Sequence, residues 1–114
     1  MKYTYGEFSK DQLGEVKQKM RKQIFFLLLI VDPSTSEEYK NVDVVGAFKN
    51  VLYMFGGLND LLGYQREFVD VMSLLNAAFL ELQSDTFNWQ TYRKLILDAG
   101  NAVLAIKEVD YAES

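Results

Sequence analysis

Apolar residues recur along the chain at alternating spacings of three and four, which is the period of one face of an α-helix. The first such segment begins at Ser9, which fits a capping box with Gln12. It ends at Asp32-Pro33, because the residue before a proline is disfavoured in the α region. The pattern therefore predicts a first helix over residues 9–31. Its apolar stripe consists of Leu13, Val16, Met20, Ile24, Leu27 and Val31.

A polar linker separates this helix from a second apolar segment, which Asn41 or Asp43 can cap. Gly56-Gly57 interrupts the second segment. Each glycine costs about 1 kcal/mol relative to alanine in a helix, so the second helix is expected to weaken or break there. Gly63 can close the following turn in a left-handed conformation. The core face of this helix is formed by Val44, Phe48, Val51, Leu52 and Phe55.

The same spacing predicts a third helix over residues 65–83 and a fourth that runs from a cap at Asp85 or Asn88 to about Val109. Small residues around Gly100 allow another helix to approach the fourth closely. The inward positions are Phe68, Met72, Leu75, Phe79 and Leu82 in the third helix, and Trp89, Tyr92, Ile96, Ala99, Val103 and Ile106 in the fourth.

Four amphipathic helices with short connections predict an all-α fold, an antiparallel bundle of about four helices. The chain of 114 residues is one helical domain, residues 1–114. Residues 1–8 are aromatic-rich without a helical period, and we expect them to form an arm that packs on the bundle. The acidic residues 110–114 are expected to fray.

Composition excludes much chemistry. The chain has no cysteine and no histidine, so disulfides, thiolate nucleophiles and imidazole ligands are absent. No glycine-rich phosphate-binding loop occurs in the sequence. We therefore expect no enzyme activity and no cofactor. The net charge of −4 also argues against general binding to nucleic acid.

The apolar run IFFLLLIV at residues 24–31 follows several basic residues and raises the question of a signal or membrane segment. It has eight residues, whereas a bilayer-spanning helix needs about 20. The run meets Asp32-Pro33 and lacks the small residues of a cleavage site. The sequence therefore predicts a cytoplasmic protein with no membrane span.

The end of the first helix is apolar on all sides. Phe25, Phe26 and Leu29 fall opposite its main stripe at 100° per residue. One interpretation is that this half of the helix lies at the centre of the bundle, with the other helices around it. The other is that these side chains form a surface for self-association or for a protein partner. The sequence leaves both interpretations open.

Charge is distributed unevenly. Residues 1–22 carry six basic and three acidic residues, a net charge of +3, whereas residues 23–114 carry a net charge of −7. Lys17, Arg21 and Lys22 belong to a solvated helix face or contribute to a partner-binding surface. Nucleic acid is an unlikely partner except through this basic N-terminal helix. Glu15 precedes Lys19 by four residues, the favourable order for an ion pair.

An ExxD motif at residues 67–70 places Glu67 and Asp70 on adjacent turns, where they can hold Mg²⁺. The stretch REFVDVMSLLNAAFLELQSD resembles the ExxD-bearing helix of all-α nucleoside-triphosphate pyrophosphohydrolases of the MazG and dimeric dUTPase type. The resemblance covers about one helix and implies a helical enzyme with Mg²⁺ bound by carboxylates from two helices. The partner motif EExxE is missing, because Glu37-Glu38 is followed by Asn41.

Three tyrosines, Tyr39, Tyr53 and Tyr64, fall off the apolar stripes, and exposed tyrosines are useful in interfaces. The function that the sequence favours is a non-catalytic helical protein-interaction module. It would act as a subunit of a larger assembly or as an accessory or inhibitory factor of the kind encoded by phages and mobile elements, with a protein partner or by self-association. The alternative is a divergent Mg²⁺-dependent pyrophosphohydrolase that uses Glu67 and Asp70.

Overall fold

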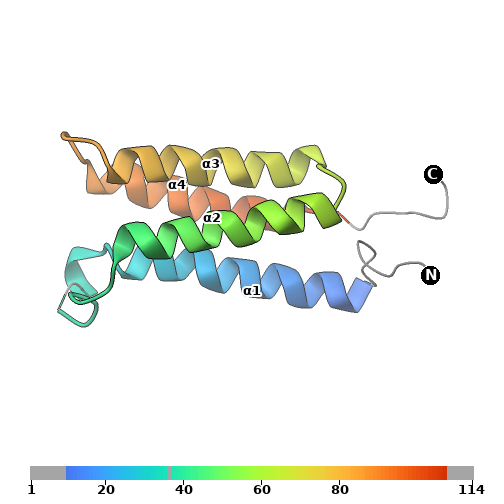
Figure 1. The fold of residues 1–114 in the computed structure, drawn as a ribbon, viewed down its shortest axis with the longest axis horizontal. Coiled ribbons are helices and arrows are strands. Elements are labelled where there is room, and N and C mark those ends of the chain that lie inside the picture. The colour runs from blue at the N-terminus through green and yellow to red at the C-terminus, as the bar shows by residue number, and fades with distance from the viewer. Residues whose placement is uncertain (1–9, 36, 108–114) are drawn as a thin grey trace.

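The computed structural model describes residues 10–35 and 37–107, and this part of the chain forms a four-helix bundle (Figure 1). Its elements are α1 (Lys10–Leu29), η1 (Pro33–Thr35), α2 (Val44–Leu61), α3 (Arg66–Leu82), α4 (Trp89–Ala102) and η2 (Val103–Ala105). Consecutive helices pack side by side and antiparallel, and α4 also packs against α1, so the four helices enclose one core. The predicted all-α antiparallel bundle is confirmed. None of the helices described is long and apolar enough to cross a membrane.

The core is built from the apolar stripes of all four helices, because each stripe removes its side chains from water only against the others. Phe48 of α2 lies at its centre, with its ring centroid 5.0 Å from that of Phe79 and 6.4 Å from that of Tyr92. Within the described residues, no charged side chain is buried in this core. Its largest fully buried side chains are Tyr92, Phe48, Phe55, Phe68, Met20, Ile24, Leu27, Leu62, Leu75 and Ile96.

The helix α1 ends at Leu29, two residues before the predicted end. Asp32 follows, and its carboxylate oxygen Oδ1 accepts hydrogen bonds of 2.8 Å from the backbone N–H and from the hydroxyl of Ser34. These bonds favour the ionised carboxylate and lower the pKa of Asp32. The predicted cap at Ser9, the arm over residues 1–8 and the tail over residues 110–114 lie outside the described residues.

Both ends of α2 are capped as the sequence predicted. The Asp43 side chain accepts a hydrogen bond of 3.0 Å from the backbone N–H of Gly46. At the other end Gly63 adopts the left-handed conformation, with φ of 78°. The next residue, Tyr64, donates its backbone N–H to the Asn59 carbonyl at 3.0 Å. This bond completes a Schellman motif and satisfies a carbonyl that the helix end would leave free.

The expected break at Gly56-Gly57 is wrong, because α2 continues through both glycines to Leu61. The two glycines together cost about 2 kcal/mol of helix stability. The turns on either side offset this cost, since Phe55 and Leu62 are buried in the core. Burial of one large apolar side chain contributes about 1.5–3 kcal/mol. Tertiary packing therefore keeps the helix continuous at Gly56-Gly57, where its local helix propensity is low.

Replacing both glycines with alanine (Gly56→Ala and Gly57→Ala together) is expected to stabilise the fold by about 1–2 kcal/mol. A Cβ built at either position meets no atom within 4 Å, so the gain in helix propensity carries no steric cost. Urea unfolding followed by circular dichroism measures the change. Gly46→Ala is the control, because a Cβ there would collide with the Asp43 carboxylate that caps α2. A destabilised double variant would contradict the prediction.

The helix α4 is shorter than predicted. It ends at Ala102 rather than near Val109, and Ile106 is already extended. The cause is a long-range contact: the Lys17 ammonium group of α1 donates hydrogen bonds of 2.9 Å to the carbonyls of both Leu104 and Ile106. Carbonyls that bind this ammonium group satisfy their hydrogen bonding without a further helical turn.

The chain after η2 is also attached to the start of α3. The Gln65 side chain donates to the Lys107 carbonyl at 2.9 Å and accepts from the Lys107 backbone N–H at 2.7 Å. The Lys107 ammonium group forms an ion pair of 3.0 Å with Glu67. These contacts hold the end of the described chain against α1 and α3.

Candidate functional site

Phe25 is half-buried and packs against α4. Its ring packs against Gly100, where a Cβ would lie 2.9 Å from the ring atom Cε1. The guanidinium carbon of Arg21 lies 5.3 Å from the centroid of the same ring, within the range of a cation–π interaction. Two of the predicted partner-binding residues, Phe25 and Arg21, thus contact each other at the α1–α4 interface. The small residue predicted to allow close approach, Gly100, does so here.

Phe26 and Leu29 are less covered by the bundle than the other core-facing residues of α1. Each has 39% of its surface exposed. The Phe26 ring meets the edge of the Tyr39 ring, with 5.8 Å between centroids. The bundle therefore covers these two side chains only in part.

The two predicted lysine candidates have different roles. Lys17 is engaged within the chain, through the two carbonyls beyond α4. Lys22 is exposed, and no carboxylate of the described residues forms an ion pair with it. Lys22 is therefore available to a partner, whereas Lys17 stabilises the fold.

Glu67 and Asp70, the ligands of the alternative enzyme hypothesis, are not joined by a third acid. Hydrogen bonds from its own backbone N–H and from the Lys107 ammonium group lower the pKa of Glu67. Asp70 is exposed on α3. In the described part of the chain, no group of three or more acidic side chains gathers where a metal ion could bind. Glu67 forms a surface ion pair with Lys107.

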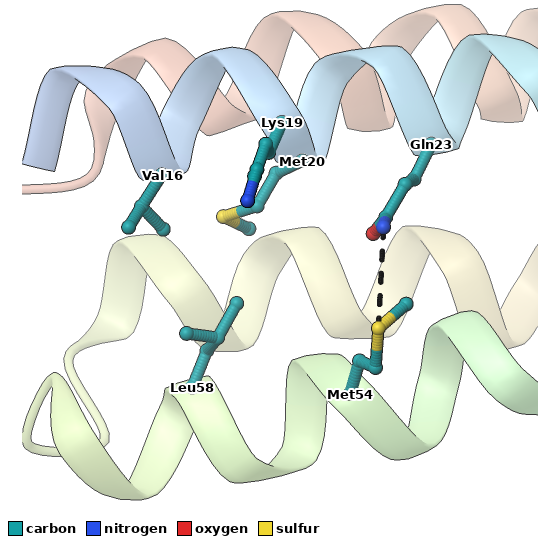
Figure 2. Close-up of a pocket in the computed structure, with 6 residues that line it drawn as sticks. All are labelled: Val16, Lys19, Met20, Gln23, Met54 and Leu58. Atoms are coloured by element: carbon teal, nitrogen blue, oxygen red, sulfur yellow. Dashed lines mark hydrogen bonds between the residues drawn. The ribbon is translucent and has the colours of Figure 1, made fainter.

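A groove between α1 and α2 provides a surface that the sequence did not predict. Figure 2 shows side chains of both helices directed toward each other across an open space. The groove has a volume of about 360 Å³, within the range of sites that bind ligands. We call it the α1–α2 groove. Its lining residues are Val16, Lys19, Met20, Gln23, Met54 and Leu58.

Methionines dominate the chemistry of the groove. Met20 is buried at its floor, and Met54 is 42% exposed on the α2 side. The Gln23 amide donates a weak hydrogen bond to the Met54 sulfur at 3.9 Å (Figure 2). Methionine is flexible and polarisable, and it is over-represented on surfaces that adapt to protein partners.

A second hollow, of about 490 Å³, lies over the solvent side of α2 and shares Met54 with the groove. It exists because Gly56 and Gly57 carry no side chain into the space. Tyr53 borders it and is 85% exposed. We call the α1–α2 groove together with this hollow the apolar face. It combines the groove, the exposed ring of Tyr53 and the two glycines of α2, Gly56 and Gly57.

One charge of each sign flanks the apolar face. Lys19 lines the groove from α1, and Asp60 lines the hollow from α2. Neither forms an ion pair within residues 10–35 and 37–107. Lys19 and Glu15 line another small hollow, yet the ion pair predicted between them does not form. Two flanking charges therefore remain unneutralised.

Sequence reasoning noticed parts of this face without joining them. Tyr53 stood out because it lies off the apolar stripe, and Gly56-Gly57 stood out as a potential break. No sequence pattern singled out Met54 as part of a binding surface. Only the position of α1 beside α2 brings these residues together, and helical periodicity within one segment does not determine which helices are neighbours. No protein-family model, curated protein or solved structure is significantly similar to this chain.

Proposed function

We propose that this chain is a non-catalytic protein-interaction module whose apolar face accepts a helix of a protein partner. It would act in the cytoplasm as a subunit of a larger assembly or as an accessory or inhibitory factor of the kind encoded by phages and mobile elements. The observation that carries the proposal is the α1–α2 groove, which shares Met54 with the hollow that the exposed ring of Tyr53 borders. A groove of this kind can bind the apolar side of an amphipathic helix.

The exposure of Tyr53 and Met54 supports this function. Exposed apolar residues are ordinary when they are scattered, but contiguous apolar surface marks interaction sites. Met54 lines both the groove and the hollow. Tyr53 precedes Met54 in the sequence and also lines the hollow. Tyrosine and methionine are also the residue types enriched at the centres of protein interfaces.

The glycine pair gives independent support. Gly56 and Gly57 weaken α2, yet no atom of residues 10–35 and 37–107 lies where a side chain at either position would begin. Gly100, by contrast, is in contact with the Phe25 ring. A partner helix that packs against the exposed backbone of α2 would make the same use of Gly56 and Gly57.

Site-specific photo-crosslinking in the native host tests the proposal. A photoreactive phenylalanine analogue in place of Tyr53 is expected to form a covalent adduct with a protein. The same analogue in place of Leu80, which is 70% exposed on α3, serves as the matched control and should give little adduct. Equal labelling from both positions, or no adduct from position 53, would count against the apolar face.

A second variant separates binding from folding. Met54→Lys places a charge in the groove at a partly exposed position, where the long side chain can reach water. We expect the helical circular dichroism signal to remain and the adduct from position 53 to disappear. Persistence of the adduct would show that the partner does not use the groove.

A further inference from the structure

The two charges beside the apolar face constrain what can bind there. Lys19 lines the groove from α1 and Asp60 lines the hollow on α2, so the two charges lie in different parts of the apolar face, which Met54 joins. A partner that neutralises both must place an acidic group over Lys19 and a basic group over Asp60. A helix of one charge sign would satisfy one side and meet repulsion on the other.

The apolar face itself meets this requirement. Rotation of a second copy by half a turn about a line that runs parallel to the helices, midway between Lys19 and Asp60, exchanges the α1 side of the apolar face with its α2 side. Each Lys19 then faces the Asp60 of the other copy. The rotation also lays α1 of one copy antiparallel to α2 of the other, since the two helices are antiparallel within each chain.

We infer that the partner of the apolar face is a second copy of this chain, packed as a two-fold symmetric dimer. The inference rests on the proposed function and names its partner. Closed two-fold dimers are the commonest protein oligomers, and they bury the same patch of both subunits. The exposed side chains of Tyr53 and Met54 pack on α1 of the other copy, and Gly56-Gly57 lets the helices approach closely.

Charge reversal tests this arrangement through sedimentation velocity over a series of protein concentrations. The unmodified chain is expected to dimerise. Lys19→Glu and Asp60→Lys, each made alone, are expected to raise the dimer Kd about tenfold or more, because two favourable pairs become two repulsive ones. The double variant reverses both partners of each pair. It is expected to return the Kd to within about threefold of the unmodified chain.

Matched controls separate this contact from general effects of charge. Lys49→Glu makes the same change of charge at an exposed position of α2 that lines neither hollow, and it should leave the Kd unchanged. The Gly56→Ala and Gly57→Ala double variant should dimerise more weakly while its monomer becomes more stable. If the two glycines had a purely structural role, their replacement would not stabilise the monomer and weaken the dimer at the same time.

Each outcome bears on the inference. Dimerisation that the single reversals weaken and the double reversal restores supports it. A chain that stays monomeric at every concentration overturns it, as does a dimer that is insensitive to both reversals. The proposed function fails separately. A crosslinked adduct from position 53 whose mass differs from two copies of the chain would support protein binding and reject the second copy.

Discussion

Replacing Phe48 with alanine is expected to lower the free energy of unfolding by about 3–5 kcal/mol. Phe48 is fully buried and packs against Phe79 of α3 and Tyr92 of α4, so its removal leaves a cavity that three helices line. Domains of this kind have a total stability of about 5–15 kcal/mol, so the variant would lose about a fifth of it or more. The corresponding fall in Tm is roughly 10–25 °C.

Thermal and urea unfolding followed by circular dichroism provide the measurement. Tyr53→Ala is the matched control, since it removes an aromatic ring from the same helix at an exposed position. In solutions dilute enough to dissociate the proposed dimer, the control should stay within about 0.5 kcal/mol of the unmodified protein. A loss below about 1 kcal/mol in the Phe48 variant would mean that the centre of the core lies elsewhere.

Alkaline pH is expected to destabilise the protein through Tyr92. Its hydroxyl donates a hydrogen bond of 2.7 Å to the Leu27 carbonyl and is buried in the core. Burial disfavours the phenolate and raises the pKa of Tyr92 well above its ordinary value. The folded protein therefore keeps a proton that the unfolded chain releases above about pH 10. Stability from this group is complete below that pH and is lost as the pH rises, by about 1.4 kcal/mol per pH unit.

The variant Tyr92→Phe tests this prediction, because the difference in stability between it and the unmodified chain should change sign as the pH rises. Near neutral pH the variant should be less stable by about 1–2 kcal/mol, because it leaves the Leu27 carbonyl without its donor. Above about pH 10 the difference should shrink, and between about pH 11 and 12 it should reverse. Urea unfolding at a series of pH values follows the crossover. Tyr53→Phe, at an exposed site, should show none, and parallel pH profiles for Tyr92→Phe and the unmodified chain would refute the argument.

Sequence pattern predicted the local features of this fold well. The caps are the clearest example: the Asn88 side chain accepts a hydrogen bond of 3.0 Å from the backbone N–H of Thr91, and Asp43 and Gly63 act as expected at α2. A cap needs only residues within one turn, so a short stretch of sequence contains all the information. The burial of Ile24 and Ile96 follows equally from helical periodicity.

The errors share a cause, which is contact between distant segments. The continuation of α2 through Gly56-Gly57 depends on core packing, and the early end of α4 depends on Lys17 of α1. Phe25 is not an error of this kind, because one of the two interpretations of the sequence placed the other helices around this half of α1, and α4 packs on Phe25. The apolar face was missed for the same reason, because its two sides belong to different helices. Whether Phe26, Leu29 and Lys22 bind a partner stays a prediction.

The attachment of Lys107 to Gln65 and of Lys17 to the carbonyls beyond α4 links three stretches of chain at one end of the bundle. An amide proton exchanges with solvent only when its hydrogen bond opens. The Lys107 amide, beyond the last helical turn, should therefore exchange together with the first turn of α3 rather than as a frayed end. Hydrogen exchange would then show this end of the bundle opening as one cooperative unit.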